Sequence, residues 1–318
     1  MKDFRGRTAV ITGAGSGFGR EFARIAAGLE MNVVLADVQQ DALDAVAAEL
    51  EAHGTRVLAR KVDVSKADEI EALAAETDSS FGATHLLFNN AGVGSGGLIW
   101  ENSVRDWEWV LGVNLWGVIH GIRSFVPRML GAAKKDASYA GHVVNTSSMA
   151  GLLNAPNMGI YNVSKHAVVS LTETLYQDLA LIEAPIGASV LCPYFVSTGI
   201  SASERNAPGD VSSEPLSASK RAQQMMSQKA VGSGKVTAVG VAESVFEAIR
   251  ANRFYVFSHP HALGNVETRM KDIIDIRNPS DPFAARPDVR ARLRVAMAMT
   301  TDADAASAQG TTRKGDAS

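Results

Sequence analysis

The sequence feature that most constrains the fold is a regular alternation of short apolar runs and amphipathic stretches from Thr8 to about His259. Several of the runs are continuous Val, Ile and Leu, which is typical of strands buried on both faces of a parallel sheet. We expect strands at Thr8–Ile11, Asn32–Asp37, Arg56–Val64, His85–Asn89, His142–Thr146, Ala188–Pro193 and Phe254–Ser258. Helical patterns separate them, among them Gln40–His53, Lys66–Ser80, Val104–Leu130 and Ile160–Ile182. The alternation predicts an α/β fold, with one doubly wound, parallel, seven-stranded sheet that carries helices on both faces.

Two segments depart from this alternation. Ser197–Gly240 is rich in Ser, Ala, Gly, Pro and Met and has little strand character, so we expect a mobile lid or disorder, and its place after a strand end favours a lid. A single domain is expected over residues 1–258, followed by a C-terminal extension, residues 259–318. In the extension we expect a second helix over 288–299 and disorder from about residue 300. Its first helix is expected to have one face made of Val266, Met270, Ile273 and Ile274.

Charge and cysteine content exclude several classes of partner. The chain has 31 Lys and Arg against 34 Asp and Glu, and nucleic acids or anionic membranes favour a basic excess, so neither partner is expected. No apolar run approaches the ~18 residues of a spanning helix, and the early strand at Thr8 is expected to leave no room for a signal peptide. The single cysteine, Cys192, permits no intramolecular disulfide and no multi-thiolate metal site. We expect a cytoplasmic protein without a bound metal.

A glycine-rich loop, Thr12–Gly19, joins the first strand to a helical pattern. Glycines let the backbone turn tightly and approach a pyrophosphate closely, and the N-terminus of the following helix supplies partial positive charge. Glycine-rich turns are common, but this one lies at the start of a βαβ unit, as dinucleotide binding requires. The residues expected to contact a dinucleotide here are Gly13, Ser16, Gly17, Phe18 and Gly19.

The second strand ends at Asp37, eighteen residues after Gly19. A carboxylate there can accept hydrogen bonds from the hydroxyls of an adenosine ribose and would repel the 2′-phosphate of NADP. No Arg or Lys stands at positions 16, 38, 39 or 40 to offset that repulsion, so the sequence favours NAD over NADP. The alternative is an ordinary turn or capping aspartate. Further contacts to the cofactor are expected from Val38, Asp63, Val64, Asn90, Ala91 and Gly92, each of which could instead be a simple turn residue.

Tyr161 and Lys165 stand four residues apart in a helical pattern, which places them on one face of a helix. Tyrosine is a poor base at neutral pH, but a nearby ammonium and the positive nicotinamide of NAD⁺ would lower the pKa of its hydroxyl. Ser148 follows a strand end and could donate a hydrogen bond to a carbonyl or alkoxide oxygen. Asn114 is a polar residue in an otherwise apolar helix. It is either a satisfied core amide or part of a helix distortion that holds a water for proton relay.

The motifs at Thr12–Gly19 and Asn89–Gly92, together with these four polar residues, resemble the short-chain dehydrogenase/reductase family over about residues 3–258. The resemblance implies a Rossmann-like fold and a nicotinamide cofactor. It also implies a role for each catalytic candidate. Tyr161 would be the general acid/base, and Lys165 would lower the pKa of Tyr161 and bind the nicotinamide ribose. Ser148, rather than Ser147, would position the substrate oxygen, and Asn114 would hold the relay water.

The end of the sixth expected strand also resembles a family pattern, Pro-Gly-x-Val-x-Thr. In this chain Pro193, Val196 and Thr198 match it, and the resemblance implies that the last two contact the nicotinamide carboxamide. Tyr194 replaces the glycine. We therefore expect a substrate pocket whose shape differs from the usual one.

These residues indicate an NAD(H)-dependent enzyme that interconverts a secondary alcohol and a ketone by direct hydride transfer, with Tyr161 moving the proton. The alternative is a non-catalytic protein that senses NAD(H) on the same fold. Such a protein would be expected to lose one of the four catalytic residues, and all four are present. The resemblance also implies a homodimer or homotetramer built through the helices at Val104–Leu130 and Ile160–Ile182, both of which are apolar on more than one face.

The pocket above Ser148 and Tyr161 is expected to bind a bulky, hydrophobic or aromatic small molecule, because its candidate lining is apolar, aromatic and thioether-rich. None of the candidates is Arg or Lys, so a carboxylate or phosphate would lack a bidentate partner. Alternatively, Tyr194 and Phe195 pack only against the nicotinamide or the core. The candidates are Gly94, Ser95, Ala150, Asn154, Met158, Tyr194, Phe195, Met225 and Met226, and direct substrate contacts are expected from Ser148, Asn154, Met158, Tyr161, Tyr194 and Phe195.

Overall fold

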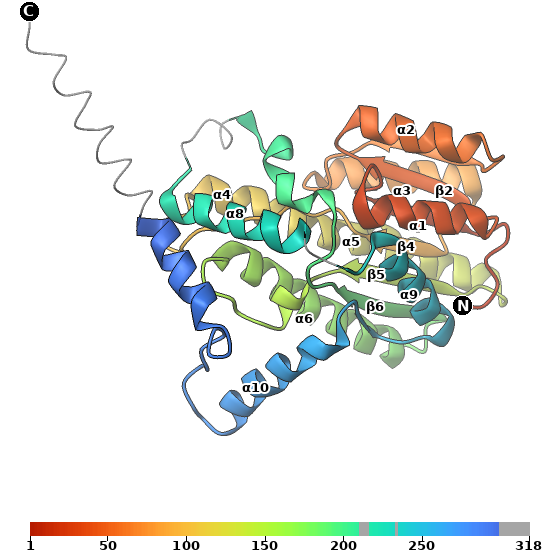
Figure 1. Ribbon diagram of the computed structural model, residues 1–318. Coiled ribbons are helices and arrows are strands. Elements are labelled where there is room, and N and C mark those ends of the chain that lie inside the picture. Colours follow the sequence, from red (N-terminus) through yellow and green to blue (C-terminus); the bar gives the residue numbers. More distant parts are fainter. Residues whose placement is uncertain (210–215, 233–234, 299–318) are drawn as a thin grey trace, which may run out of the picture.

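A computed structural model describes residues 1–209, 216–232 and 235–298. Seven strands form one parallel sheet in the order β3-β2-β1-β4-β5-β6-β7 (Figure 1). They are β1 (Thr8–Thr12), β2 (Asn32–Asp37), β3 (Val57–Lys61), β4 (Leu86–Asn89), β5 (Gly141–Thr146), β6 (Ile186–Cys192) and β7 (Tyr255–Phe257). The predicted parallel, seven-stranded sheet is confirmed. The order reverses between β1 and β4, and ligands of open α/β sheets bind at such a switch point.

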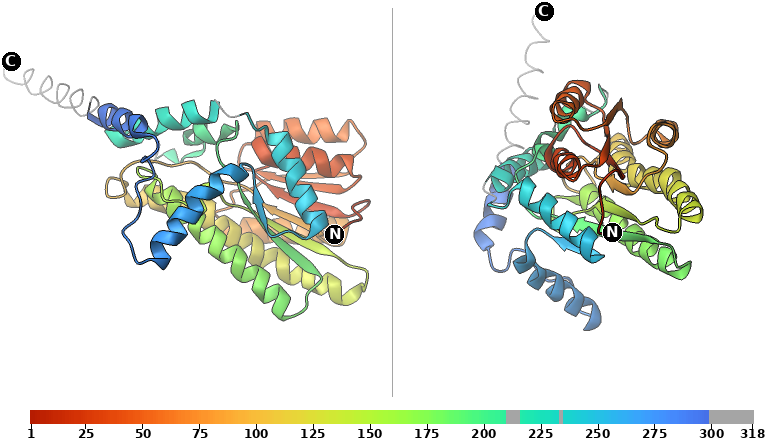
Figure 2. Two further views of the ribbon diagram at one scale, coloured as in Figure 1. Left: turned by 60° about the horizontal axis from the view of Figure 1, so that its bottom comes forward. Right: turned by 90° about the vertical axis from the view of Figure 1, so that its right-hand side faces the viewer.

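Helices cover both faces of the sheet (Figure 2). One face packs against α1 (Gly17–Gly28), α2 (Gln40–Glu51) and α9 (Ala238–Ala251) through a buried cluster that includes Phe22, Leu43 and Phe246. The other packs against α3 (Ala67–Phe81), α5 (Gly117–Lys135) and α6 (Gly159–Leu181) through a cluster that includes Ile70, Phe125 and Leu175. The five inner strands are buried from both sides, which accounts for their apolar runs, whereas the edge strands β3 and β7 are partly exposed.

The single helix expected at Val104–Leu130 is instead interrupted. A capping box, in which the Ser103 and Asp106 side chains each bond to the other's backbone, begins α4 (Val104–Leu111). A π-helical turn, η1 (Gly112–Trp116), then joins α4 to α5. Single π-turns of this kind are frequent at functional sites, and this one contains Asn114.

The described part of Ser197–Gly240 is mostly helical, so of the two expectations the structure argues against disorder there, and the favoured one, a lid, stays a prediction. It forms η3 (Gly199–Asn206) and α8 (Ala218–Gly232), and its last residues begin α9. Contacts distant in sequence hold α8 in place: Lys220 Nζ lies 2.6 Å from Asp106 Oδ2, and Ser219 Oγ accepts a 3.0 Å hydrogen bond from Leu98 N. These partners are more than a hundred residues away along the chain, so local composition did not reveal them.

The C-terminal extension continues as α10 (Leu263–Ile274) and a helix over residues 287–298, close to the expected 288–299. Residues from 300 onward, for which disorder was expected, lie outside the described chain. The expected apolar face of α10 is only partly buried, since Ile273 and Ile274 are 58% and 76% exposed. A polar face of α10, with Asn265, Thr268, Arg269 and Asp272, lines a cavity instead. Among the described residues, no helix is both long and apolar enough to span a membrane.

Candidate active site

Two adjoining cavities open at the carboxyl ends of the strands. The smaller, of about 430 Å³, lies beside the glycine-rich loop and Asp37. The larger, of about 1080 Å³, is bounded by loops after β4 and β5, by α8 and by α10. Tyr161 and Thr198 line both. A molecule bound in the smaller cavity can therefore meet a molecule bound in the larger one at Tyr161.

The glycine-rich loop has no room for side chains where it turns. Gly13 has φ +66°, and a Cβ atom there would lie 2.8 Å from the Ala91 Cα atom. The loop is tied to the end of β4, because Thr12 Oγ1 accepts hydrogen bonds from Asn90 N (2.9 Å) and Ala91 N (3.1 Å). This closely packed turn at the N-terminus of α1 fits the diphosphate of a dinucleotide.

Asp37 is positioned by two backbone amides. Its Oδ2 atom accepts a 2.8 Å hydrogen bond from Gly15 N, and Oδ1 accepts a 2.9 Å bond from Gln39 N. The carboxylate is half-buried and lines the smaller cavity. A carboxylate fixed in this way has lone pairs left for ribose hydroxyls.

Most residues predicted to bind the cofactor line the smaller cavity. Gly19 and Val196 do not: Gly19 is buried beneath the loop, and Val196 lines the larger cavity. The residues that do are Gly13, Ser16, Gly17, Phe18, Asp37, Val38, Asp63, Val64, Asn90, Ala91, Gly92, Tyr161, Lys165, Pro193 and Thr198.

Three basic residues that the sequence analysis missed also line this cavity: Lys66, Arg105 and Arg205. Arg205 lies in η3, and its Nη1 atom donates to Gly199 O (2.8 Å) and Ala202 O (2.9 Å). Its Nε atom lies 3.4 Å from Gln39 Oε1, close to Asp37. The sequence could not place Arg205 there, because 166 positions separate it from Gln39.

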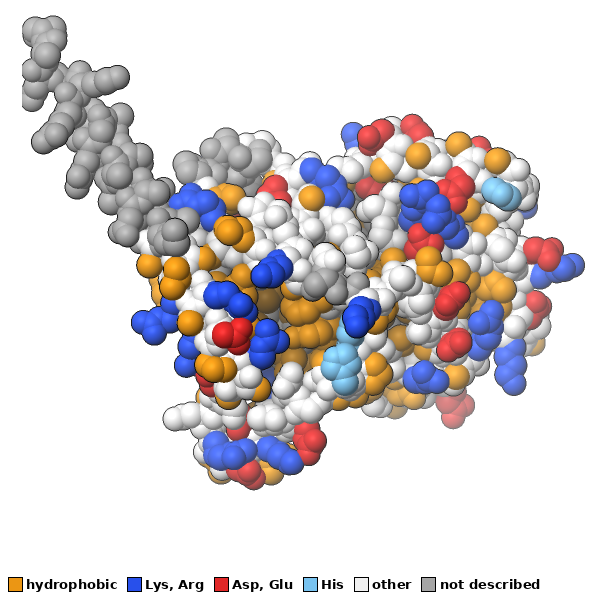
Figure 3. Space-filling model, viewed as in Figure 1, with side chains coloured by type: hydrophobic (Ala, Val, Ile, Leu, Met, Phe, Trp, Pro, Cys, Tyr) orange, Lys and Arg blue, Asp and Glu red, His pale blue; other side chains and the backbone are white. Residues whose placement is uncertain are grey.

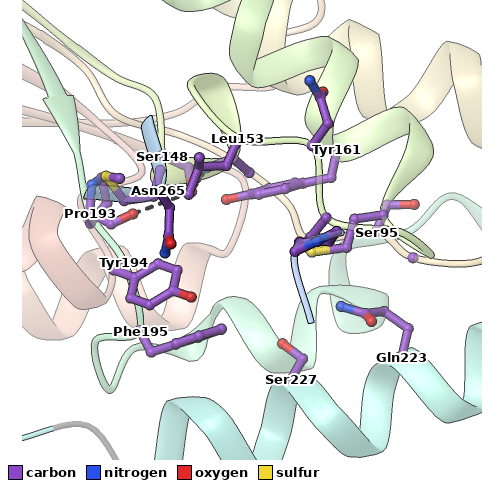
Figure 4. Close-up of a pocket in the computed structure, with 18 of the residues that line it drawn as sticks. Ser95, Ser148, Leu153, Tyr161, Pro193, Tyr194, Phe195, Gln223, Ser227 and Asn265 are labelled. Carbon is purple, nitrogen blue, oxygen red and sulfur yellow. Dashed lines mark hydrogen bonds between the residues drawn. The ribbon is translucent and has the colours of Figure 1, made fainter. Parts of the chain in front are cut away.

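Tyr161, Ser148 and Lys165 come together at the junction of the cavities. The Tyr161 hydroxyl points into the larger cavity toward Ser148 (Figure 4). Ser148 Oγ donates to Pro193 O (3.3 Å) and accepts from Ala150 N (3.1 Å). The Lys165 ammonium lies 5.6 Å from the centre of the Tyr161 ring and donates to Thr146 O at 3.0 Å.

Burial shifts the acid–base properties of this pair. It raises the pKa of the Tyr161 hydroxyl to about 12, although a hydrogen bond with Ser148 acts in the opposite direction. It also lowers the pKa of Lys165 to about 8, because a buried ammonium loses hydration. The expected fall in the tyrosine pKa is therefore not produced by the protein alone, where burial outweighs the hydrogen bond with Ser148.

The other polar candidates face the protein interior. Ser147 Oγ donates to Lys165 O at 2.8 Å, so its hydroxyl is engaged with the α6 backbone, as expected if Ser148 is the substrate-facing serine. Asn114 is fully buried in the π-turn: its Oδ1 atom accepts from Val93 N (2.8 Å) and its Nδ2 atom donates to Val93 O (3.0 Å). The amide is thus satisfied and the helix is distorted around it, and a role for Asn114 in holding a relay water stays a prediction.

The larger cavity has the expected aromatic wall. Tyr194 and Phe195 lie with ring centres 4.3 Å apart, and both side chains line the cavity (Figure 4). The other expected lining residues Gly94, Ser95, Ala150, Asn154 and Met158 line it as well. Met225 and Met226 do not, and Met225 is 65% exposed, because α8 turns Gln223, Gln224 and Ser227 toward the cavity instead.

The expectation that no cation lines the pocket is wrong. Lys220 of α8, Arg269 of α10 and Arg277 beyond it all line the larger cavity. No part of the C-terminal extension was predicted to line the site, because a polar face of a helix is usually exposed to solvent. The i, i+3, i+4 spacing of Asn265, Thr268 and Arg269 was the available signal.

A doubly wound parallel sheet with a glycine-rich turn, a fixed carboxylate after β2 and a Tyr–Lys–Ser group at the cavity junction defines a dinucleotide-dependent oxidoreductase. Comparison with known proteins agrees. The sequence profile of the short chain dehydrogenase family matches residues 7–209. The chain belongs to the short-chain dehydrogenase/reductase family and is an oxidoreductase of that family.

Similarity to individual dehydrogenases and to a solved structure supports this assignment. The chain is 33% identical to a CLA biosynthesis dehydrogenase/reductase of Lactiplantibacillus plantarum, over 86% of this chain and 95% of that protein. It is 31% identical to a C alpha-dehydrogenase of Sphingobium, over 92% and 93% of the two chains. The crystal structure of a short-chain dehydrogenase/reductase from Burkholderia phymatum, in complex with NAD, has 52% sequence identity and a TM-score of 0.85, and the match covers 89% of this chain and 99% of that one.

Proposed function

We propose that this protein is an NAD(H)-dependent enzyme that interconverts a bulky, hydrophobic or aromatic secondary alcohol and its ketone. The observation that carries the proposal is the Tyr161 hydroxyl, which points toward Ser148 at the junction of the two cavities (Figure 4). A nicotinamide ring extending from the smaller cavity and a carbinol carbon in the larger one would meet at this hydroxyl.

Four side chains of the protein transfer the proton or support that transfer. Ser148 donates a hydrogen bond to the substrate oxygen, and Tyr161 takes the hydroxyl proton in oxidation or returns it in reduction. Lys165, whose ammonium lies 5.6 Å from the tyrosine ring, stabilises the phenolate and binds the nicotinamide ribose. Asn114 holds the π-turn beside Lys165 and Val93 and serves the proton relay. When bound, NAD⁺ supplies the hydride acceptor and a positive charge that favours the phenolate further.

Asp37 supports NAD rather than NADP as the cofactor. Its carboxylate is fixed by two amides at the end of β2, where ribose hydroxyls would bind and a 2′-phosphate would be repelled. The Arg205 guanidinium lies beside Gln39, two residues after Asp37, but its Nη1 atom is engaged with two carbonyls of its own helix. The complex of the Burkholderia phymatum relative with NAD supports the same choice.

The size and the aromatic wall of the larger cavity support a bulky substrate. Tyr194, Phe195, Leu153 and Met158 provide apolar surface on several sides. Residues 1–258 would form the catalytic domain, with the described helices of 197–240 as its lid and the extension as an additional wall. We also propose a homodimer or homotetramer, because Trp116 on η1 and Val163 on α6 leave large apolar side chains exposed on the expected interface helices.

A panel of secondary alcohols with NAD⁺, followed by NADH absorbance, tests the proposal. Tyr161→Phe should retain NADH binding in a fluorescence titration yet lose about 10²–10⁴-fold in kcat/KM, the usual contribution of general acid–base catalysis. Phenylalanine fills nearly the same space as tyrosine, so the loss in kcat/KM measures the contribution of the hydroxyl group and not a change in packing. Near-normal turnover by this variant would overturn the mechanism. Tight NADH binding by the wild-type protein, with no turnover of any alcohol or ketone, would favour the non-catalytic alternative.

A further inference from the structure

The helix α10 presents a polar face to the larger cavity. Asn265, Thr268, Arg269 and Asp272, spaced i, i+3, i+4 and i+7, all line it. This spacing places them on one side of the helix. The segment lies beyond residues 7–209, the part of the chain matched by the family profile.

Arg269 differs from the other two basic residues of the cavity wall. The Lys220 ammonium is paired with Asp106 at 2.6 Å, and the Arg277 guanidinium is paired with Asp272 at 3.1 Å. For Arg269, the described residues include no carboxylate within salt-bridge distance and no hydrogen-bond acceptor. A half-buried guanidinium that faces a cavity without a counter-charge favours an anionic ligand.

The neighbours of Arg269 do not supply the missing charge. His166 of α6 is close enough for Arg269 to lower its pKa, and burial lowers that pKa more strongly, so the imidazole is neutral at pH 7. The acidic side chains of the cavity wall bond elsewhere: Asp272 also accepts from Ser280, and Glu204, in η3, accepts from Gln224. Asp281 pairs with Arg290 at 2.6 Å, and Asp106 pairs with Lys220 as stated above. The positive charge of Arg269 is therefore available to a ligand.

Arg269 lies farther from the reacting atoms than Asn265 does. The Asn265 side chain extends into the cavity near Ser148 and Tyr194 (Figure 4), and α10 runs from there away from the sheet (Figure 1). Four residues of α-helix advance by about 6 Å. The space-filling view shows a hydrophobic hollow at this face of the molecule, with Lys and Arg side chains around it (Figure 3).

We propose that the substrate carries a carboxylate remote from its carbinol carbon and that Arg269 binds this carboxylate. The inference rests on the proposed function and adds the chemistry of the substrate's far end. The carbinol binds at Ser148 and Tyr161, an apolar body crosses the hollow beside Tyr194, and the acid reaches the wall of α10. A carboxylate fits better than a phosphate ester, because Arg269 offers one planar guanidinium and a single charge, which match a monoanion bound through two parallel hydrogen bonds.

Pairs of (ω−1)-hydroxy fatty acids and their methyl esters, in a series of chain lengths, test this proposal. Each pair has the same secondary carbinol and apolar body, and only the acid carries the charge. With NAD⁺ as the oxidant, the wild-type enzyme should prefer the acid, with an optimum chain length set by the distance from Tyr161 to Arg269. Arg269→Gln should lower kcat/KM for the acid by about 10–100-fold, the range typical of a charge-assisted hydrogen bond, and leave the ester within about twofold.

Two further variants control for loss of charge and for folding. Lys271→Gln removes a charge from the same helix, but Lys271 is paired with Glu267 and does not line the cavity, so both substrates should be unaffected. Arg269→Lys keeps the charge without the planar fork and should retain part of the acid preference.

The outcomes separate the two proposals. If the alcohols are oxidised but acid and ester react equally well, or if Arg269→Gln weakens both alike, the carboxylate proposal is overturned and the proposed function stands. If no alcohol in the series or in the wider panel is oxidised and no ketone is reduced, although NADH binds, the proposed function fails first.

Discussion

Because we propose NAD as the cofactor, we expect that replacing Asp37 by Ser shifts the cofactor preference toward NADP. Backbone amides of Gly15 and Gln39 hold the carboxylate at 2.8 and 2.9 Å, so its charge lies at a fixed place beside the smaller cavity. Serine keeps a short polar side chain that can still bond to a backbone amide, but it removes the charge. The change therefore isolates the electrostatic contribution of position 37.

The magnitude follows from two interactions. Hydrogen bonds from ribose hydroxyls to a carboxylate contribute about 1.5–3 kcal/mol to NAD binding, and the substitution removes most of this. Repulsion between the carboxylate and a phosphate charge ~5 Å away is about 1–3 kcal/mol per unit charge, for an effective dielectric constant between ~80 and ~20. Together they amount to about 2.5–6 kcal/mol, so the ratio of kcat/KM for NAD⁺ over NADP⁺ should fall by a factor of about 10² to 10⁴.

Steady-state rates with both cofactors and one alcohol measure this ratio. Arg205, whose Nε atom lies 3.4 Å from Gln39 Oε1, provides an internal control. If its guanidinium attracts the 2′-phosphate once Asp37 is neutralised, the double variant Asp37→Ser/Arg205→Ala should lose the gain with NADP⁺ and leave NAD⁺ kinetics as in the single variant. A wild-type enzyme that uses both cofactors equally well, or a single variant with an unchanged ratio, would refute this interpretation of Asp37.

Two further predictions concern stability. A methyl group at Gly121 of α5 would overlap the Asn89 side chain, so Gly121→Ala should lower the free energy of unfolding by about 1–3 kcal/mol. Gly131, on the same helix, has open space around it, so Gly131→Ala should raise the free energy of unfolding by about 0.5–1 kcal/mol. If urea unfolding gave changes of the same sign for both variants, the close packing described at Gly121 would be contradicted. Hydrogen bonds with Arg24 and a second arginine lower the pKa of Glu49 to about 2, so its stabilising effect should be present above pH 4.5 and lost as the pH falls toward 2. Glu49→Gln should therefore cost about 1 kcal/mol at pH 7, given a partly exposed pair, and nothing near pH 2, and equal losses at both pH values would count against the ion pair.

The parts of the fold that could be predicted from the sequence are those that local patterns encode. Continuous apolar runs correspond to the seven strands, and the glycine turn and the Tyr161–Lys165 spacing locate the junction of the two cavities. Strand ends were less accurate. The run Arg56–Val64 yields only the five residues Val57–Lys61, because pairing with β2 ends at Lys61.

The rest of the site depends on contacts between distant parts of the chain. The position of α8 depends on the ion pair between Lys220 and Asp106, which lies 114 positions earlier, and nothing near Lys220 in the sequence predicts that pair. Arg205 beside Gln39 and Arg269 beside His166 are likewise tertiary contacts. Composition rich in small and polar residues predicted a lid or disorder but no helices, because intrinsic propensity says little about a helix that is held by a few polar contacts.

The course of the chain separates the residues proposed to catalyse the reaction from those proposed to select the substrate. Residues up to Thr198 provide six of the seven strands, most of the lining of the smaller cavity and the Tyr161 group. The chain then leaves the core to form η3, which completes the smaller cavity, and α8, which lies over the larger one. It returns through α9 and β7, whose side chains complete the core against β6, before leaving again as α10. The helices α8 and α10, which form two walls of the larger cavity, are thus attached to elements of the core and contribute few side chains to it. Substitutions on the cavity faces of α8 and α10 should therefore change which alcohol is bound while the proton-transfer geometry at Tyr161 stays the same.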